Sequence, residues 1–257
     1  VNSKKFYKQD QKLRIFNKKK IKLYPPDVFY KLKVGDILEI GFEGLRCKLI
    51  KKNNKEIVTK VLKSGFLEGN KGVYVSNRNI KLNFITKKDE AAIKIGKEMR
   101  IKNYALSFVN NKEDIIKFNK ILPKENKIFK IETKAAMKNL KDIIRYGNQF
   151  LIDRGDLSKE ILIEQIPIAQ RKILNIAKKK NKRVYIATNF LESMILHSYP
   201  TRAEVNDIFN ALELGSSGIV LAAETAIGKY PLECINLLKK IIKTFKFYKK
   251  NNPKQYG

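Results

Sequence analysis

The spacing of apolar and polar residues divides the sequence into two parts that meet after Thr86. In the first part, short runs of β-branched and aromatic residues alternate with polar residues, and clusters of Gly, Asn and Lys separate the runs. This pattern is typical of antiparallel strands joined by turns. A weaker strand is expected at residues 13–16, inside a Lys-rich stretch. The main strands are expected at residues 36–40, 45–50, 57–62 and 73–75.

In the second part, short apolar runs alternate with longer segments whose apolar residues recur at helical spacing. We expect strands at residues 104–109, 128–131, 149–152, 184–187 and 218–221. Helices are expected at residues 87–99, 112–121, 134–145, 161–180, 201–214 and 232–247. Strands that alternate with helices predict a parallel sheet with right-handed crossovers.

The chain is therefore assigned to the α/β class. Its expected order is a basic N-terminal segment (1–27), a small antiparallel β domain (28–85), a parallel α/β domain (86–248) and a basic tail (249–257).

Polar residues gather where the expected parallel strands end. Lys130 and Glu132 are two positions apart and share a strand face; Gly155 and Asp156 follow the next strand, and Thr188 follows the one after. The carboxyl ends of parallel strands carry the site in α/β proteins. Carboxylates suit Mg²⁺, while a lysine and free backbone N–H groups suit an anion. The pattern predicts a site for Mg²⁺ and a phosphorylated acid; the alternative is a set of helix-capping residues.

Charge and cysteine content limit the partners. The 55 basic and 25 acidic residues give a formal net charge of +30, which raises the possibility of a polyanionic partner. The basic residues are mostly lysines, spread along the chain beside many Asn and Ile, so we expect no specific nucleic-acid binding. Two distant cysteines indicate a reducing, cytoplasmic setting. No apolar run approaches the roughly 18 residues that cross a bilayer, so no membrane segment is expected.

A first prediction concerns this charge. We expect DNA and RNA to bind weakly, without sequence preference, and to be released by roughly 0.2 M salt, because such binding rests on counterion release alone. Fluorescence anisotropy with two unrelated oligonucleotides measures it. A sequence preference that survives this salt concentration would instead indicate a nucleic-acid-binding protein.

Four longer stretches resemble one enzyme family. They are LIDRGDLSKE (151–160), YIATNFLESMI (185–195), PTRAEVNDIFNALE (200–213) and AAETAIGKYPL (222–232). With them, the chain from about residue 33 to residue 240 resembles pyruvate kinase. The resemblance implies a partial (β/α)8 TIM-type barrel, in which the five strands are barrel strands four to eight and the β domain is the one inserted after the third strand.

The resemblance also implies the chemistry. Phosphoryl transfer between phosphoenolpyruvate and ADP, giving pyruvate and ATP, is expected with Mg²⁺ (or Mn²⁺) and K⁺. Lys130 and Thr188 match catalytic residues: the lysine stabilises charge on the phosphoryl group and the enolate, and the hydroxyl lies beside the enolate face that is protonated. Glu132 and Asp156 match the metal ligands. Substrate contacts are implied for Lys130, Arg154, Gly155, Asp156 and Thr188.

The sequence also departs from the family pattern. Asp153 replaces a small residue, Asn189 a glutamine and Asn110 an arginine, and Ala222–Ala223 replaces Ser-Gly. Barrel strands one and two have no counterpart, and the third is at most a relic near residues 13–15. The phosphate-binding arginine and the K⁺ ligands of those strands are missing with them. Two functions stay open: an active phosphotransferase, or a non-catalytic relative that keeps the metal-binding carboxylates.

The outer strands bear on assembly. Five parallel strands leave two edges, at residues 104–109 and 218–221, and residues 13–16 would cover one edge at most. Uncovered apolar edges recruit partners. We therefore expect a homo-oligomer, or a second chain that completes the barrel.

Overall fold

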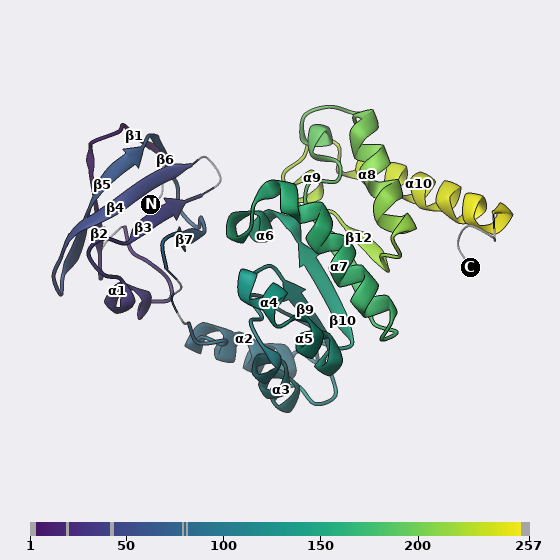
Figure 1. Ribbon diagram of the computed structural model, residues 1–257, viewed down its shortest axis with the longest axis horizontal. Coiled ribbons are helices and arrows are strands. Elements are labelled where there is room, and N and C mark those ends of the chain that lie inside the picture. The colour runs from purple at the N-terminus through teal and green to yellow at the C-terminus, as the bar shows by residue number, and fades with distance from the viewer. Residues whose placement is uncertain (1–3, 19–20, 42–43, 79, 81, 253–257) are drawn as a thin grey trace. The chain divides into compact units, whose positions relative to one another are not determined.

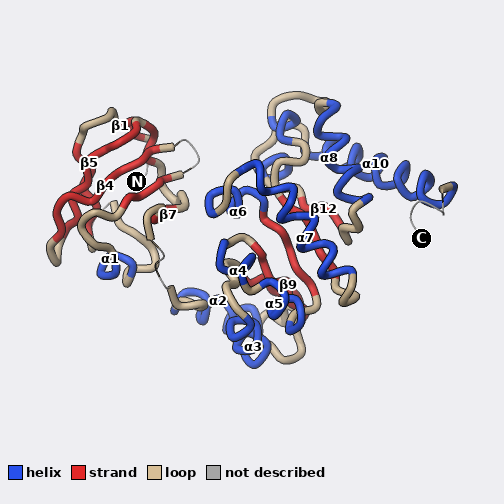
Figure 2. The backbone as a smooth tube through the Cα atoms, in the orientation of Figure 1, coloured by secondary structure: helices blue, strands red, loops and turns tan. Residues whose placement is uncertain are grey.

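The computed structural model describes residues 4–18, 21–41, 44–78, 80 and 82–252 (Figure 1). The chain forms two compact units that divide between Ala91 and Ala92. Strands dominate the first unit, and helices accompany the strands of the second (Figure 2). Among the described residues, helices with the length and apolarity needed to cross a bilayer are absent.

The first unit is built from antiparallel strands. Its elements are β1 (Lys5–Tyr7), β2 (Lys12–Phe16), α1 (Val28–Lys31), β3 (Ile37–Ile40), β4 (Leu45–Lys52), β5 (Glu56–Lys63), β6 (Gly65–Leu67) and β7 (Val73–Val75). Five of the strands form a sheet in the order β2-β5-β4-β3-β7, and β1 pairs with β6. In β4 and β5 alternate residues point into the core, as the period-two pattern predicts.

The start of the chain belongs to this unit. The sequence predicts a separate basic segment over residues 1–27, whereas β1 and β2 pair with β6 and β5. The prediction that residues 13–16 are a barrel relic or edge cover is wrong. Leu13 and Ile15 are buried in the core of this unit opposite Thr59 and Ile57, and the Thr59 hydroxyl donates to the Leu13 carbonyl at 3.1 Å.

Two other local expectations also change. The stretch around Gly65, which lies in the gap between the strands expected at residues 57–62 and 73–75, forms β6. A Cβ on Gly65 would lie 2.7 Å from the backbone nitrogen of Leu45, so this close strand approach requires glycine. A short helix, α1, lies in the region with the strand-like pattern, and its Phe29 is buried in the core.

An ion pair between half-buried Arg78 and buried Asp36 links the stretch after β7 to the start of β3. Arg78 donates to both carboxylate oxygens of Asp36, at 2.6 and 2.7 Å, and to the Lys31 carbonyl at 2.6 Å. Asp36 also accepts a hydrogen bond from the Lys33 N–H, and only 3% of Asp36 is exposed to solvent. Burial on its own raises the pKa of Asp36, but Arg78 and the Lys33 N–H outweigh it and hold that pKa below its usual value.

Removal of this arginine should destabilise the first unit. Arg78→Met leaves a buried carboxylate without its cation, and we expect a loss of about 3 kcal/mol at pH 7. Because the folded-state pKa of Asp36 is lowered, the pair adds to the free energy of unfolding at every pH above the unfolded-state pKa of about 4. This stabilisation is lost as the pH falls through the folded-state pKa. The difference between wild type and variant should therefore shrink in acid.

Hydrogen exchange of the Ile37–Ile40 amides reports this unit alone. Arg46→Met is the matched control, since the 3.5 Å pair of Arg46 with Glu39 is exposed and should contribute under about 1 kcal/mol. Equal protection in both variants would contradict the role given to Arg78.

The second unit is a parallel α/β structure. Its elements are α2 (Lys87–Glu98, which begins in the first unit), β8 (Asn103–Leu106), α3 (Lys112–Ile121), β9 (Asn126–Ile131), α4 (Lys134–Lys138), α5 (Leu140–Tyr146), β10 (Gln149–Asp153), α6 (Arg154–Glu160), η1 (Ile163–Gln165), α7 (Ile166–Lys178), β11 (Arg183–Ala187), η2 (Glu192–Ile195), α8 (Arg202–Glu213), β12 (Gly218–Val220), α9 (Ala223–Ala226) and α10 (Pro231–Asn251). The sheet order is β8-β9-β10-β11-β12, and all four strand pairs are parallel. The α/β class and the five parallel strands are confirmed. Within the described residues these strands form an open sheet whose outermost strands are β8 and β12.

The two faces of this sheet differ. Alternate residues of β9, β10 and β11 are fully buried, and between them lie half-buried residues such as Lys130, Leu151 and Asp153. Helix α7 contacts β11, and its neighbour α5 contacts α7. The half-buried face carries the polar side chains of the candidate site.

Two expected helices are interrupted. Helix 134–145 is divided at Asn139, whose side chain donates to the Asn110 carbonyl at 2.8 Å. Helix 161–180 begins only at Ile166, and the separate helix α6 starts directly after β10. Helix α6 begins early because the Asp153 carboxylate caps it by accepting from the Asp156 N–H.

Candidate functional site

Two neighbouring strands bring three charged residues together at their carboxyl ends. Lys130 is in β9, Glu132 follows that strand directly, and Asp153 ends β10. Lys130 is paired with Leu151 across the strands, so Asp153, two residues further on, lies on the same face as Lys130 and next to Glu132. The register therefore places one cation between two acids.

Lys130 lies within ion-pair distance of both carboxylates. Its Nζ is 2.9 Å from Glu132 Oε2 and 2.9 Å from Asp153 Oδ2. Burial on its own lowers the pKa of Lys130, but the two carboxylates outweigh it and raise that pKa above its usual value. The ammonium is therefore charged at neutral pH.

Glu132 is the most deeply placed acid of the group. Its side chain is fully buried, and Oε1 accepts from the Phe108 N–H at 2.6 Å. Oε2 accepts no well-aligned hydrogen bond from the described residues and has the Lys130 ammonium as its partner. Burial raises the pKa of Glu132 above its usual value, although the Lys130 ammonium and the Phe108 N–H each act to lower that pKa. A cation near Oε2 would favour the ionised carboxylate.

The acids fit a hard divalent cation. Glu132, Asp153 and Asp156 each offer a carboxylate oxygen, and these oxygens lie within 4.8 Å of one another. Carboxylate oxygens are the ligands that Mg²⁺ and Mn²⁺ prefer. The buried Oε2 of Glu132 already has a positively charged partner, the Lys130 ammonium, so it is an oxygen that a bound cation could also use. The structure thus brings together the two predicted metal ligands, and Asp156 also pairs with Lys159 at 2.8 Å.

Asp153 belongs to this group, although the sequence marks it only as a departure from the family pattern. The sequence contains a pattern that could have identified Asp153: the alternation that puts Lys130 and Glu132 on one strand face also applies to the next strand. Applied across the strand register, it places Asp153 on the same face.

The first turn of helix α6, directly after β10, is already hydrogen-bonded. The Gly155 N–H donates to Thr188 Oγ1 at 2.9 Å, and the Asp156 N–H donates to Asp153 Oδ1 at 3.4 Å. The Thr188 hydroxyl donates to the Ala187 carbonyl at 2.6 Å. A substrate carboxylate would have to replace these acceptors. A Cβ on Gly155 would meet only ordinary van der Waals contacts at 3.5 Å and beyond, so packing within the fold does not require glycine there.

Arg154 supports the loop that carries Thr188. Its Nη2 and Nε donate to the Thr188 carbonyl at 2.5 and 3.2 Å, and its Nη1 donates to Asp207 at 2.7 Å. The guanidinium also lies 4.0 Å from the centre of the Phe190 ring. These contacts hold Arg154 against the loop and helix α8; substrate contact by this residue stays a prediction.

Glu224, a buried acid that the sequence places at the end of the last parallel strand, supports the same loop. Thr188 and Asn189 have positive φ angles of 74° and 57°, a conformation that side chains other than glycine rarely adopt. Glu224, which is 2% exposed, accepts from the N–H groups of Leu191 and Ala222 at 3.2 and 2.7 Å. Glu224 and Arg154 therefore hold the left-handed turn from two sides.

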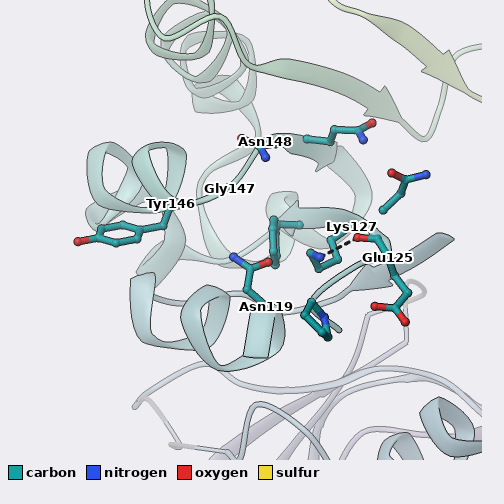
Figure 3. A pocket seen from close by; sticks show the side chains of 10 residues that line it. Asn119, Glu125, Lys127, Tyr146, Gly147 and Asn148 are labelled. Carbon is teal, nitrogen blue, oxygen red and sulfur yellow. Dashed lines mark hydrogen bonds between the residues drawn. The ribbon is translucent and has the colours of Figure 1, made fainter. Parts of the chain in front are cut away.

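A small cavity lies at the opposite ends of the strands (Figure 3). It measures about 250 Å³, and Asn126 and Gln149, the first residues of β9 and β10, line it. The ammonium of Lys127 there already donates to the Leu122 and Glu125 carbonyls at 2.5 and 2.7 Å. This cavity is separate from the carboxylates and holds none of the predicted site residues.

Comparisons with known proteins agree with the sequence motifs. A family model described as the pyruvate kinase barrel domain matches residues 2–235. The chain is similar to a pyruvate kinase of Thermotoga maritima, with 39% identity over 223 residues, which are 85% of this chain and 47% of the relative. It is also similar to those of Methanocaldococcus jannaschii (38% identity; 81% and 47% covered) and Buchnera aphidicola from Acyrthosiphon pisum (36%; 83% and 46%). The chain spans about half the length of these curated relatives.

Proposed function

The chain belongs to the pyruvate kinase family, and from this premise we propose that it is a phosphotransferase of that type. The proposed reaction transfers the phosphoryl group between phosphoenolpyruvate and ADP, giving pyruvate and ATP. The observation that carries the proposal is the Lys130 ammonium, held at the strand ends among three carboxylates.

In the forward direction, the bond between phosphorus and the enol oxygen breaks, and an oxygen of the ADP β-phosphate bonds to phosphorus. The resulting enolate then gains a proton on carbon to give pyruvate. Negative charge shifts onto the enol oxygen, and Lys130 is the half-buried cation that stabilises it. Thr188, held by the Gly155 N–H, is assigned to the face of the enolate that is protonated.

Cofactors and partners follow from the same assignment. Glu132 and Asp156 would hold Mg²⁺ or Mn²⁺, and the positive charge of the cation would offset negative charge on the substrate oxygens. K⁺ is proposed as a second cofactor from the family alone. Strands β8 and β12 are proposed to pair with further barrel strands, in a homo-oligomer or with a second chain. A cytoplasmic location is proposed, since Cys47 and Cys234 are both buried and free.

One observation favours the alternative, a non-catalytic relative that keeps the carboxylates. The N–H groups assigned to the substrate carboxylate already donate to Thr188 and Asp153. In that case the chain would bind the cation but would not turn over.

A coupled assay decides between these functions. Pyruvate formed from phosphoenolpyruvate and ADP is measured through lactate dehydrogenase, with Mg²⁺, with and without K⁺, and with chelator as a control. We expect pyruvate formation that requires Mg²⁺. A folded chain that binds Mn²⁺ but makes no pyruvate under any of these conditions would refute turnover and support the non-catalytic alternative.

A further inference from the structure

The Lys130 ammonium is the partner of a carboxylate oxygen that a divalent cation would bind. Glu132 Oε2 is buried, and its partner among the described residues is the ammonium at 2.9 Å. A metal ion bonded to that oxygen would lie within a few ångströms of the ammonium, and two cations so close in a partly buried site repel strongly. The ammonium and the cation therefore cannot both remain at Glu132.

Asp153 provides a second place for the ammonium. Its Oδ2 is 2.9 Å from Lys130 Nζ, while its Oδ1 accepts from the Asp156 N–H at the start of α6. The cap fixes the carboxylate at the end of β10, so it stays within reach of the ammonium after Glu132 is lost to the cation. Asp153 also adds a third negative charge, with Glu132 and Asp156, to a site that includes two lysines, Lys130 and Lys159.

We propose that Lys130 and a divalent cation compete for Glu132, and that Asp153 receives the ammonium when the cation binds. The proposal rests on the proposed function in placing that cation at Glu132 and Asp156. Lys130 thus acts as an internal counter-ion in the metal-free protein, and Asp153 is a positioning residue that keeps it in the site when metal binds.

The test measures Mn²⁺ affinity of the full chain by the electron paramagnetic resonance signal of free Mn²⁺. Lys130→Met removes the competitor, and Mn²⁺ should bind roughly tenfold more tightly. Asp153→Asn keeps a side chain that caps helices but removes the charge, and Mn²⁺ should bind roughly tenfold more weakly; both are of the order expected for one nearby charge in a partly screened site. The control is Asp142→Asn on the exposed face of α5, expected within about twofold of wild type.

The sign of the Lys130→Met effect separates this idea from structural damage, which can only weaken binding. Unchanged or weaker binding in folded Lys130→Met, unchanged binding in Asp153→Asn, or no Mn²⁺ binding by the wild type would each overturn the proposal. A chain that makes no pyruvate but shows the expected order of affinities refutes turnover alone. A chain that makes pyruvate while Lys130→Met binds Mn²⁺ no more tightly refutes this inference alone.

A second measurement uses the wild-type chain, in case Lys130→Met does not fold. The rate of Lys130 acetylation by an N-hydroxysuccinimide ester is followed by peptide mass spectrometry with and without saturating Mg²⁺. We expect a higher rate with Mg²⁺, because the released amine has lost one of its two carboxylate partners. Lys127, held by two carbonyls at the other end of β9, is the internal control. An unchanged or lower Lys130 rate would overturn the proposal.

Discussion

Replacing Lys130 with alanine is expected to lower kcat for pyruvate formation at least about 100-fold, while KM for phosphoenolpyruvate changes far less. In the proposed reaction, charge develops on the enol oxygen and the phosphoryl group, and Lys130 is assigned to stabilise it. One preorganised charge of this kind contributes several kcal/mol to the transition state. Because the effect arises in the transition state, kcat should fall more than substrate affinity. Steady-state kinetics at saturating Mg²⁺, with circular dichroism to verify folding, measure it.

Lys127→Ala is the matched control for this variant. Lys127 is in the same strand, three residues earlier, and its ammonium donates to backbone carbonyls at the other end of the sheet. We expect its kcat to stay near that of the wild type. A folded Lys130→Ala protein with normal kcat would show that Lys130 is only a structural cation.

Removing either predicted metal ligand should abolish divalent-cation binding. For Glu132→Ala and Asp156→Ala we expect Mn²⁺ affinity to fall about 100-fold or more, since each variant removes a charged oxygen ligand from a site that offers few others. The fold should persist, because Glu132→Ala leaves Lys130 paired with Asp153 and Asp156 is only partly buried.

Isothermal titration with Mn²⁺ measures this effect, and Glu164→Gln, which changes an exposed acid in η1, is the control. Unchanged affinity in both ligand variants would refute the metal site. Together with the expected effect of Lys130→Met, the results would separate two roles within one site. Loss of the lysine should strengthen metal binding, while loss of Glu132 or Asp156 should abolish it.

Local pattern was sufficient for the parallel sheet and insufficient for the start of the chain. The five strands of the second unit are short apolar runs bounded by helices, which the sequence displays directly. In strand β2, Leu13 and Ile15 alternate with Lys12 and Arg14, and Leu13 pairs with Thr59 of β5, 46 residues away. Such a pairing depends on a distant partner, and local periodicity does not specify it.

The same limit applies to the site. Lys130 and Glu132 are found by alternation within one strand, whereas Asp153 requires the register of its neighbour. Arg154 resembles a substrate-binding residue in its motif. In the structure, Arg154 donates hydrogen bonds to Asp207, 53 residues later, and to the backbone carbonyl of Thr188. Residues that act through distant partners are the ones that a motif alone misplaces.

The pairing of β1 and β2 within the first unit bears on how the protein is made. All strands of that unit, from Lys5 to Val75, come from one continuous stretch of chain, and each finds its partner inside that stretch. During synthesis, this whole set is translated before β8. Domains generally fold as units, with the N-terminal unit first. The first unit can therefore fold before the parallel sheet is complete, so its strands have found their partners before all the apolar strands of the second unit are available.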